Sequence, residues 1–267
     1  MLKTKILDEA KHEIEHKNLN LGLGIIQVGD NPNSNIYIKN KIKACEKVGI
    51  EVIYKKLDSS IVEEKLIELI ESFNNDDNIT GIILQSPLPS HLDFDKCSSY
   101  ILSSKDVDGF TKENVYKLYL NQKGILPCTV KGIIRLLEEY KISLEGANIA
   151  IIGRGNIVGK PLAMAMENRN ATVTLCHSKT KNIKDITRNA DIVISACGIP
   201  HFVTEDMIKD GAVVVDVGIS KVADKIVGDV DFDNVKDKAS FITPNPGGVG
   251  PMTVAMIIDN LIEMGEE

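Results

Sequence analysis

The sequence predicts an α/β fold of two domains, each built around a mainly parallel sheet. Two series of short apolar runs alternate with amphipathic helical stretches, and a segment marked by Gly124 and Pro127 separates them. A third observation is an apolar helical stretch at the end of the chain, which needs a partner surface. We expect this last helix to return to the first domain.

The first series alternates strands and helices in the order β-α-β-α-β. The expected strands are Leu21 to Val28, Glu51 to Leu57 and Ile79 to Gln85, and the expected helices run from about Asn35 to Lys47 and from Ile61 to Phe73. Such alternation implies right-handed crossovers, and therefore parallel strands that are covered by helices on both faces.

The second series begins after a short helical stretch at Asn114 to Leu120. Helices are expected from Thr129 to Tyr140 and, at the end of the chain, from Pro251 to Met264. The strands between them are expected at Asn148 to Ile152, Thr172 to Leu175, Asp191 to Ser195, Ala212 to Asp216 and Ser240 to Thr243. The first domain is therefore expected to comprise residues 1–121 and 251–267, and the second residues 122–250.

Composition excludes several classes of function. The 31 basic and 38 acidic residues give a net charge of −7, so a nucleic acid is not an expected partner. No stretch approaches the roughly 20 apolar residues of a membrane span, and we expect no signal peptide. The five cysteines are widely spaced without a C-x-x-C pair, which predicts buried thiols in a reducing cytoplasm and neither a disulfide framework nor a metal site.

A glycine-rich turn follows the strand expected at Asn148 to Ile152. Gly153, Gly155 and Gly159 have the spacing G-x-G-x-x-x-G, one residue longer than the usual dinucleotide fingerprint, and a helix is expected to begin near Lys160. Glycines permit a tight turn and a close approach of the backbone, and the N-terminus of a helix attracts a pyrophosphate. The turn predicts a Rossmann-type nucleotide site, while a purely structural glycine turn is the alternative.

The residues after the next strand favour NADP over NAD. NAD sites usually carry a carboxylate about 20 residues after the glycine turn, where it binds the ribose hydroxyls. This chain has Cys176, His177, Ser178 and Lys179 in that region, with no carboxylate. The Ser178 hydroxyl between two cationic or potentially cationic groups suits a 2′-phosphate, as does Arg154 in the glycine turn. The alternative is that these residues form a solvated loop with no ligand.

Candidate catalytic residues lie in the first domain. Gln85 ends an expected strand and is followed by Pro87 and Pro89. These prolines have no backbone N–H to donate, so the hydrogen bonds between strands cannot continue past Gln85. Tyr37 and Lys41 share one face of a predicted helix because they are four residues apart. Each signal alone is weak, since such pairs are usually exposed and a Gln at the end of a strand is commonly a cap.

Several longer segments together resemble the methylenetetrahydrofolate dehydrogenase/cyclohydrolase family, across almost the whole chain and in the expected order. They are Val28 to Pro32 with Tyr37 and Lys41, Gln85 to Pro89, Lys105 to Phe110, Pro127 to Thr129, Gly153 to Pro161 and Pro244 to Thr253. Three positions depart from the family pattern, which usually has Leu, Pro and Ser where this chain has Ser86, Val130 and Gly155. The last change removes a hydroxyl beside the cofactor phosphates.

The resemblance implies an oxidoreductase and a hydrolase in one chain. The first activity oxidises 5,10-methylenetetrahydrofolate to 5,10-methenyltetrahydrofolate with NADP, and the second hydrolyses that product to 10-formyltetrahydrofolate. Hydride transfer needs mainly positioning, whereas hydrolysis needs proton transfer. The resemblance also implies a place in one-carbon metabolism and purine biosynthesis, and a cytoplasmic homodimer joined through the cofactor domains.

The resemblance implies roles for particular residues. Lys41 is expected to transfer protons, Gln85 to orient Lys41, Tyr37 to stack on the folate, and Asp108 to accept paired hydrogen bonds from the pterin. The further substrate-binding residues are expected to be Leu84, Ser86, Pro246, Gly247 and Gly250. The expected cofactor-binding residues are Gly153, Arg154, Gly155, Gly159, His177, Ser178 and Ile219.

Two other classes of function compete with this hypothesis. Another two-domain NADP dehydrogenase, similar to shikimate dehydrogenase, would explain the glycine turn but not the segments Gln85 to Pro89 and Pro246 to Thr253. A catalytically silent nucleotide-binding or folate-binding module is opposed by the retention of the four candidate catalytic residues. An assay of NADPH formation from methylenetetrahydrofolate distinguishes these functions.

Overall fold

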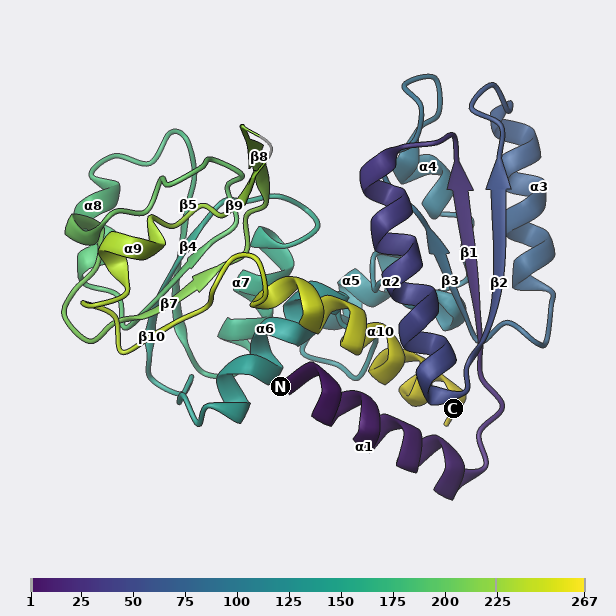
Figure 1. The fold of residues 1–267 in the computed structure, drawn as a ribbon, viewed down its shortest axis with the longest axis horizontal. Coiled ribbons are helices and arrows are strands. Elements are labelled where there is room, and N and C mark those ends of the chain that lie inside the picture. Colours follow the sequence, from purple (N-terminus) through teal and green to yellow (C-terminus); the bar gives the residue numbers. More distant parts are fainter. Residues whose placement is uncertain (1, 224, 267) are drawn as a thin grey trace. The chain divides into compact units, whose positions relative to one another are not determined.

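The computed structural model describes residues 2–223 and 225–266, which form two compact α/β units (Figure 1). Unit 1 comprises the described residues up to Cys128 and from Val254 onward, and unit 2 comprises Thr129–Thr253. Helix α10 (Val249–Gly265) begins in unit 2 and ends in unit 1. The predicted fold class, with mainly parallel sheets and a final helix that returns to the first unit, is confirmed.

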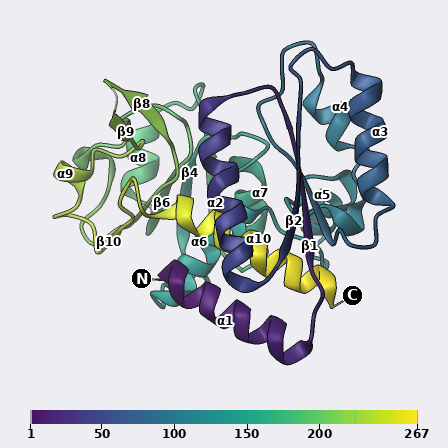
Figure 2. The same ribbon diagram turned by 45° about the vertical axis from the view of Figure 1, so that its right-hand side comes forward.

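Unit 1 is built on a parallel sheet with the strand order β2-β1-β3. The strands are β1 (Gly22–Val28), β2 (Glu51–Leu57) and β3 (Gly81–Leu84). Helices α2 (Pro32–Val48) and α3 (Glu63–Asn74) flank opposite faces of this sheet in both ribbon views (Figures 1 and 2). Because strand side chains alternate between faces, Ile26 and Val28 of β1 pack with Leu66 and Ile70 of α3.

The remaining elements of unit 1 are short, except for the first. They are α1 (Leu2–Lys17), α4 (Phe94–Ser98), the 3₁₀ turn η1 (Ser103–Lys105) and α5 (Lys112–Tyr119). Helix α1 was not predicted, although its buried residues Ile6, Leu7, Ala10 and Ile14 have helical spacing. A parallel bridge between Ile82 and Asp106 places the segment after η1 beside β3.

Unit 2 contains a parallel sheet with the strand order β10-β7-β6-β4-β5. Its strands are β4 (Asn148–Ile152), β5 (Thr172–Cys176), β6 (Ile192–Ser195), β7 (Val213–Asp216) and β10 (Phe241–Ile242). Strand β4 lies between β5 and β6 in the sheet. The strand that follows β4 in the chain, β5, is therefore on one side of it, and the next strand, β6, is on the other. Ligands of doubly wound sheets bind at such a switch point, outside the carboxyl ends of the strands.

Helices cover both faces of the sheet in unit 2. They are α6 (Cys128–Glu139), α7 (Gly159–Glu167), α8 (Ile183–Arg188), the turn η2 (Glu205–Met207) and α9 (Phe232–Val235). Residues of α8, η2 and α9 pack in one cluster with Ile152, Val193 and Val214 of the sheet. A short antiparallel hairpin, β8 (Ser220–Val222) with β9 (Lys225–Val227), follows β7.

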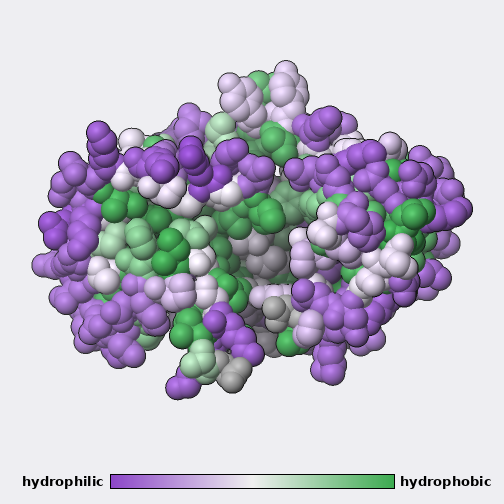
Figure 3. Space-filling model, turned by 90° about the horizontal axis from the view of Figure 1, so that it is seen from above, coloured by the Kyte–Doolittle hydropathy of each residue, from purple (hydrophilic) through white to green (hydrophobic). Residues whose placement is uncertain are grey.

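The surface is mostly hydrophilic on the face drawn in Figure 3, with hydrophobic residues in smaller groups. Within residues 2–223 and 225–266, no helix combines the length and the apolar character needed to cross a membrane. None of the five cysteines forms a disulfide. The described part of the chain also contains no group of three His, Cys, Asp or Glu side chains arranged to hold a metal ion.

Candidate active site

The first candidate site lies between helix α2 and the end of strand β3. Lys41 Nζ donates a hydrogen bond to Gln85 Oε1 at 3.1 Å, although the two residues are 44 positions apart in the chain. Strands β1 and β3 are parallel neighbours, and α2 begins just after β1, so the carboxyl end of β3 reaches the same edge as α2. The fold therefore brings together two residues that the sequence indicated separately.

The orientation of the Gln85 amide is set by its neighbours. Gln85 Nε2 donates to the carbonyl oxygen of Ser86 at 2.7 Å. The hydroxyl of Ser34, which is buried at the start of α2, donates to the same carbonyl at 3.2 Å. Since the amide nitrogen is bound there, its oxygen faces Lys41. Leu84 is buried in β3, whereas the side chain of Ser86 lies in the exposed turn that follows.

Asp108 lies in the segment that follows Asp106 beside β3. Burial of its carboxyl raises the pKa of Asp108, even though the residue keeps part of its surface accessible. The positive charge of Lys41 acts in the opposite direction, the Asp106 carboxylate raises this pKa further, and a hydrogen bond with the Cys128 thiol lowers it. The positive charge of Lys41 thus lies close enough to Asp108 to act on its carboxyl.

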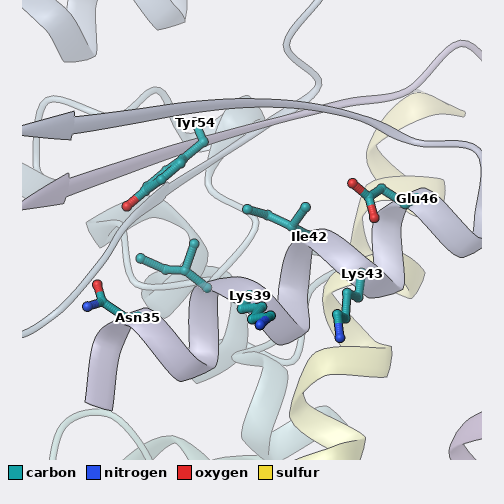
Figure 4. A pocket seen from close by; sticks show the side chains of 7 residues that line it. Asn35, Lys39, Ile42, Lys43, Glu46 and Tyr54 are labelled. Atoms are coloured by element: carbon teal, nitrogen blue, oxygen red, sulfur yellow. The ribbon is translucent and has the colours of Figure 1, made fainter. Parts of the chain in front are cut away.

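Helix α2 presents two different faces. Tyr37, which is 40% exposed, lies one turn before Lys41 on the face of the candidate site. Another face borders a shallow surface pocket against β2, and the residues that line it are Asn35, Ile38, Lys39, Ile42, Lys43, Glu46 and Tyr54 (Figure 4). Neither Tyr37 nor Lys41 lines this pocket, so the pocket is separate from the candidate site.

The second candidate site is the glycine turn after β4, in unit 2. An ideal Cβ on Gly153 would lie 2.3 Å from the carbonyl oxygen of Ala196, which follows β6. A Cβ on Gly159 would lie 2.1 Å from the carbonyl oxygen of Gly153. Nothing lies within 4 Å of a Cβ on Gly155. The close approach of the backbone therefore requires Gly153 and Gly159, whereas there is space for a side chain at Gly155.

The turn leads directly into helix α7, whose N-terminal end suits an anion. No side chain caps the helix at its N-cap residue, Val158. The first N–H groups of a helix lack partners within that helix and carry the positive end of its dipole. Residues Gly153, His177 and Ile219 follow β4, β5 and β7 at the carboxyl edge of the sheet. This cradle fits the pyrophosphate of a dinucleotide cofactor.

The residues proposed for a 2′-phosphate lie at the same edge. His177 N donates to Thr180 Oγ1 at 2.9 Å, and Lys179 N donates to His177 Nδ1 at 3.2 Å, so this segment is a defined turn. The side chains of Arg154 and Ser178 are exposed. An exposed hydroxyl and cations near a helix N-terminus can bind a phosphate.

Two buried carboxylates that the sequence analysis missed hold the neighbouring loops. Asp229 is fully buried, and its Oδ2 accepts hydrogen bonds from Ser195 Oγ at 3.0 Å and Cys197 N at 2.8 Å, just after β6. Asp216, at the end of β7, accepts from Asp229 N at 2.9 Å. Burial raises the pKa of Asp216, and the hydrogen bonds that it accepts from the backbone N–H groups of Asp229 and Val230 oppose this rise in part. The sequence contains one indication of these two carboxylates, because each lies within a run of apolar residues.

The remaining predicted substrate residues lie in the other unit from Lys41. Pro246, Gly247 and Gly250 belong to unit 2, in the segment that connects β10 to α10. The fold therefore groups Tyr37, Lys41, Leu84, Gln85, Ser86 and Asp108 in unit 1, and the glycine loop with the cofactor residues in unit 2.

Distant similarity to solved structures concerns the fold alone. The shikimate dehydrogenase of Aquifex aeolicus has a TM-score of 0.56 at 14% sequence identity, covering 92% of this chain and 96% of the other. The competing hypothesis of a shikimate-dehydrogenase-like enzyme thus corresponds to a shared two-domain architecture, without close sequence similarity.

Close similarity extends over nearly the whole chain. Residues 1–108 match the family model "Tetrahydrofolate dehydrogenase/cyclohydrolase, catalytic domain", and residues 127–267 match its NAD(P)-binding domain. The bifunctional protein FolD of Clostridium novyi is 51% identical, with 97% of this chain and 94% of that protein covered. The crystal structure of the bifunctional FolD enzyme from Campylobacter jejuni has a TM-score of 0.97 at 46% identity, covering 99% and 96%. The Trypanosoma brucei enzyme, solved with NADP and an inhibitor, has a TM-score of 0.95 at 35% identity, covering 99% and 95%. The chain belongs to the tetrahydrofolate dehydrogenase/cyclohydrolase family.

Proposed function

We propose that this protein oxidises 5,10-methylenetetrahydrofolate to 5,10-methenyltetrahydrofolate with NADP and then hydrolyses the product to 10-formyltetrahydrofolate. The observation that carries the proposal is the Lys41 ammonium, bound to Gln85 Oε1 at 3.1 Å and close enough to Asp108 to act on its charge. The family membership and the similarity to named bifunctional FolD enzymes support both activities.

In the oxidation, the protein mainly binds and orients. The Asp108 carboxylate accepts two hydrogen bonds from the pterin, and the Tyr37 ring stacks on the folate, so the donor carbon is held in place. NADP, when bound, supplies the acceptor for the hydride. Leu84, Ser86 and the residues Pro246, Gly247 and Gly250 are the further proposed contacts with the substrate.

In the hydrolysis, Lys41 moves the protons. The oxygen of water adds to the bridging carbon of the methenyl cation, and the bond from this carbon to one folate nitrogen then breaks. Lys41 acts in this step as the neutral amine, which accepts a proton from the added water and returns one to that nitrogen, while Gln85 Oε1 accepts a hydrogen bond from the amine and holds it in position. The balance is one water consumed and one proton released for each formyl group formed.

One experiment tests the proposed function directly. The purified protein is mixed with methylenetetrahydrofolate and NADP, and the formation of NADPH and the later decay of the methenyl product are followed in the same reaction. Both phases are expected. A protein that binds both ligands without forming NADPH would be the silent binding module, and the proposal would be wrong.

The NADP site is proposed to comprise Gly153, Gly155 and Gly159 around the pyrophosphate, and Arg154, His177 and Ser178 at the 2′-phosphate, with Ile219 beside the cofactor. The cradle formed by the close approach of Gly159 to Gly153 and the uncapped end of α7 supports this assignment. The solved NADP complex of the Trypanosoma brucei relative supports the choice of cofactor.

Replacing Arg154 by Ala is expected to weaken the binding of NADP about tenfold and the binding of NAD less than about twofold. Only NADP carries the 2′-phosphate that a charged hydrogen bond from Arg154 would hold. The dissociation constants of the two cofactors are measured by calorimetry. Lys184→Ala is the matched control, because it removes a cation that pairs with Asp206 elsewhere in unit 2. An equal loss of affinity for both cofactors would exclude Arg154 as the 2′-phosphate contact.

Replacing Asp108 by Asn is expected to weaken folate binding by about 100-fold while stabilising the protein at neutral pH. The folded-state pKa of Asp108 is raised, so the stability present below the unfolded pKa of about 3.9 is lost as the pH rises through the folded pKa. An Asn side chain does not titrate, so the variant does not lose stability in this way as the pH rises. Urea unfolding at several pH values and calorimetry with tetrahydrofolate test both effects, and unchanged folate affinity would remove Asp108 from the site.

We further propose a cytoplasmic homodimer that serves purine biosynthesis, with residues 1–121 and 251–267 as the folate domain and residues 122–250 as the NADP domain. The two compact units, the first of which includes the chain from Val254 onward, support this division into domains, and the family membership supports the assembly and the metabolic role. Sedimentation of the purified protein tests the assembly state, and a monomer at all concentrations would contradict it.

A further inference from the structure

A single buried amide ties together two loops next to Asp108. Asn260 lies on the part of α10 that belongs to unit 1, and none of it is exposed. Its Nδ2 donates to the carbonyl oxygens of Val107 at 2.9 Å and Leu126 at 3.0 Å, and it lies 3.5 Å from Cys128 Sγ. Two carbonyl acceptors require the NH₂ end of the amide, so the orientation of the side chain is fixed.

The loops bound by Asn260 hold Asp108 in two ways. Val107, which directly precedes Asp108, is completely buried and accepts the Asn260 bond through its carbonyl. The Cys128 thiol lies within hydrogen-bond reach of the same Val107 oxygen, at 3.3 Å, and of the Asp108 carboxyl, and its single proton can be donated to either. The backbone and the carboxyl of Asp108 therefore both depend on groups that contact Asn260.

The other side of the turn has its own anchor. Asp106 Oδ2 accepts hydrogen bonds from Thr111 N at 2.7 Å and from Asn114 Nδ2 at 3.0 Å. Those partners are near in sequence, whereas Asn260 is 153 residues from Val107. Asn260 thus links the turn to the final helix, which the local contacts of Asp106 do not do.

We infer that Asn260 is a positioning residue for folate recognition, which holds the Val107 carbonyl and Cys128 so that the Asp108 carboxylate meets the pterin in a fixed place. Paired hydrogen bonds tolerate only small displacements of the acceptor, because both must be short and nearly straight. This inference rests on the proposed function, in which Asp108 binds the pterin.

A double-mutant cycle tests the inference, with tetrahydrofolate and NADP affinities measured by calorimetry on the full chain. Asn260→Ala is expected to weaken tetrahydrofolate about tenfold and to leave NADP within about twofold. In an Asp108→Asn background, the same change is expected to weaken tetrahydrofolate less than about twofold, because Asn260 acts through Asp108. Equal losses in both backgrounds, or no loss in either, would overturn the inference.

Two further variants separate positioning from general destabilisation. Ile258→Ala removes a fully buried apolar side chain from the same helix, so it lowers Tm but is expected to leave tetrahydrofolate affinity unchanged. Asn260→Ser keeps one donor at the position and is expected to give an intermediate affinity, and it replaces Asn260→Ala in the cycle if the latter does not fold. A loss of affinity in Ile258→Ala equal to that in Asn260→Ala would show a merely structural role.

Failure of the proposed function has a different signature. A wild-type protein that binds tetrahydrofolate but forms no NADPH contradicts the proposed reaction, while the binding cycle still decides the role of Asn260. If Asp108→Asn bound tetrahydrofolate as tightly as wild type, Asp108 would not contact the pterin, and the positioning role of Asn260 would be overturned as well.

Discussion

Replacing Lys41 by Met is expected to lower the rate of methenyltetrahydrofolate hydrolysis by about 1000-fold and to leave the dehydrogenase rate within about tenfold of wild type. Met preserves much of the apolar stem of Lys but has no nitrogen that can carry a proton. General acid–base groups typically contribute factors of about 10² to 10⁴, whereas the hydride transfer depends mainly on positioning. The two rates are measured separately, from the appearance of NADPH and from the decay of added methenyltetrahydrofolate.

The same substitution at Lys39 provides the control for this experiment. Lys39 is on the same helix, but its side chain lines the pocket of Figure 4 on another face of α2. Lys39→Met is therefore expected to change neither rate by more than about twofold. If Lys41→Met reduced both activities equally, Lys41 would act in binding or folding, and its assigned role in proton transfer would be wrong.

The sequence predicted the main strands well because they are rich in β-branched and aromatic residues, whether the strand is buried like β4 or partly exposed like β2. The bounds of β4, Asn148–Ile152, and of β2, Glu51–Leu57, agree with the prediction. Strand β3 is shorter than expected, ending at Leu84, but the backbone N–H of Gln85 still donates to Ile26 at 2.8 Å. This last ladder bond explains why Gln85 lies at the end of the strand.

Apart from α1, the missed elements are short and carry little periodic signal. Helices α4 and α9 have five and four residues, too few for a helical pattern of apolar positions to be recognised. The hairpin of β8 and β9 is largely exposed, so it lacks the alternation of a half-buried strand. Such segments form because the surrounding fold fixes their ends, and that information is not local in the sequence.

The candidate site was predictable only in part for the same reason. Tyr37 and Lys41 could be placed on one helix face, but the bond from Lys41 to Gln85 depends on the adjacency of β1 and β3. The contacts of Asn260 and Asp229 join segments that are far apart in the sequence. Their residue types give no signal by themselves, because Asn and Asp occur far more often in exposed turns.

Replacing Gly159 by Ala is expected to lower NADP affinity by at least about 100-fold and the free energy of unfolding by about 3 kcal/mol. The added Cβ would lie 2.1 Å from the Gly153 carbonyl oxygen, 2.7 Å from its carbonyl carbon and 2.9 Å from Arg154 Cα. All three atoms belong to the backbone, so they cannot move aside as a flexible side chain would. The turn must open, and its N–H groups then no longer converge on the pyrophosphate.

Gly155 supplies the matched control within the same turn. A Cβ there meets nothing within 4 Å, so Gly155→Ser is expected to keep wild-type stability and NADP affinity within about threefold. Calorimetry with NADP at a temperature well below Tm separates loss of binding from unfolding, and tetrahydrofolate binding reports whether unit 1 remains folded. If Gly159→Ala bound NADP like wild type, the glycine turn would be a structural connection, and the cofactor would have to bind elsewhere on the carboxyl edge of the sheet.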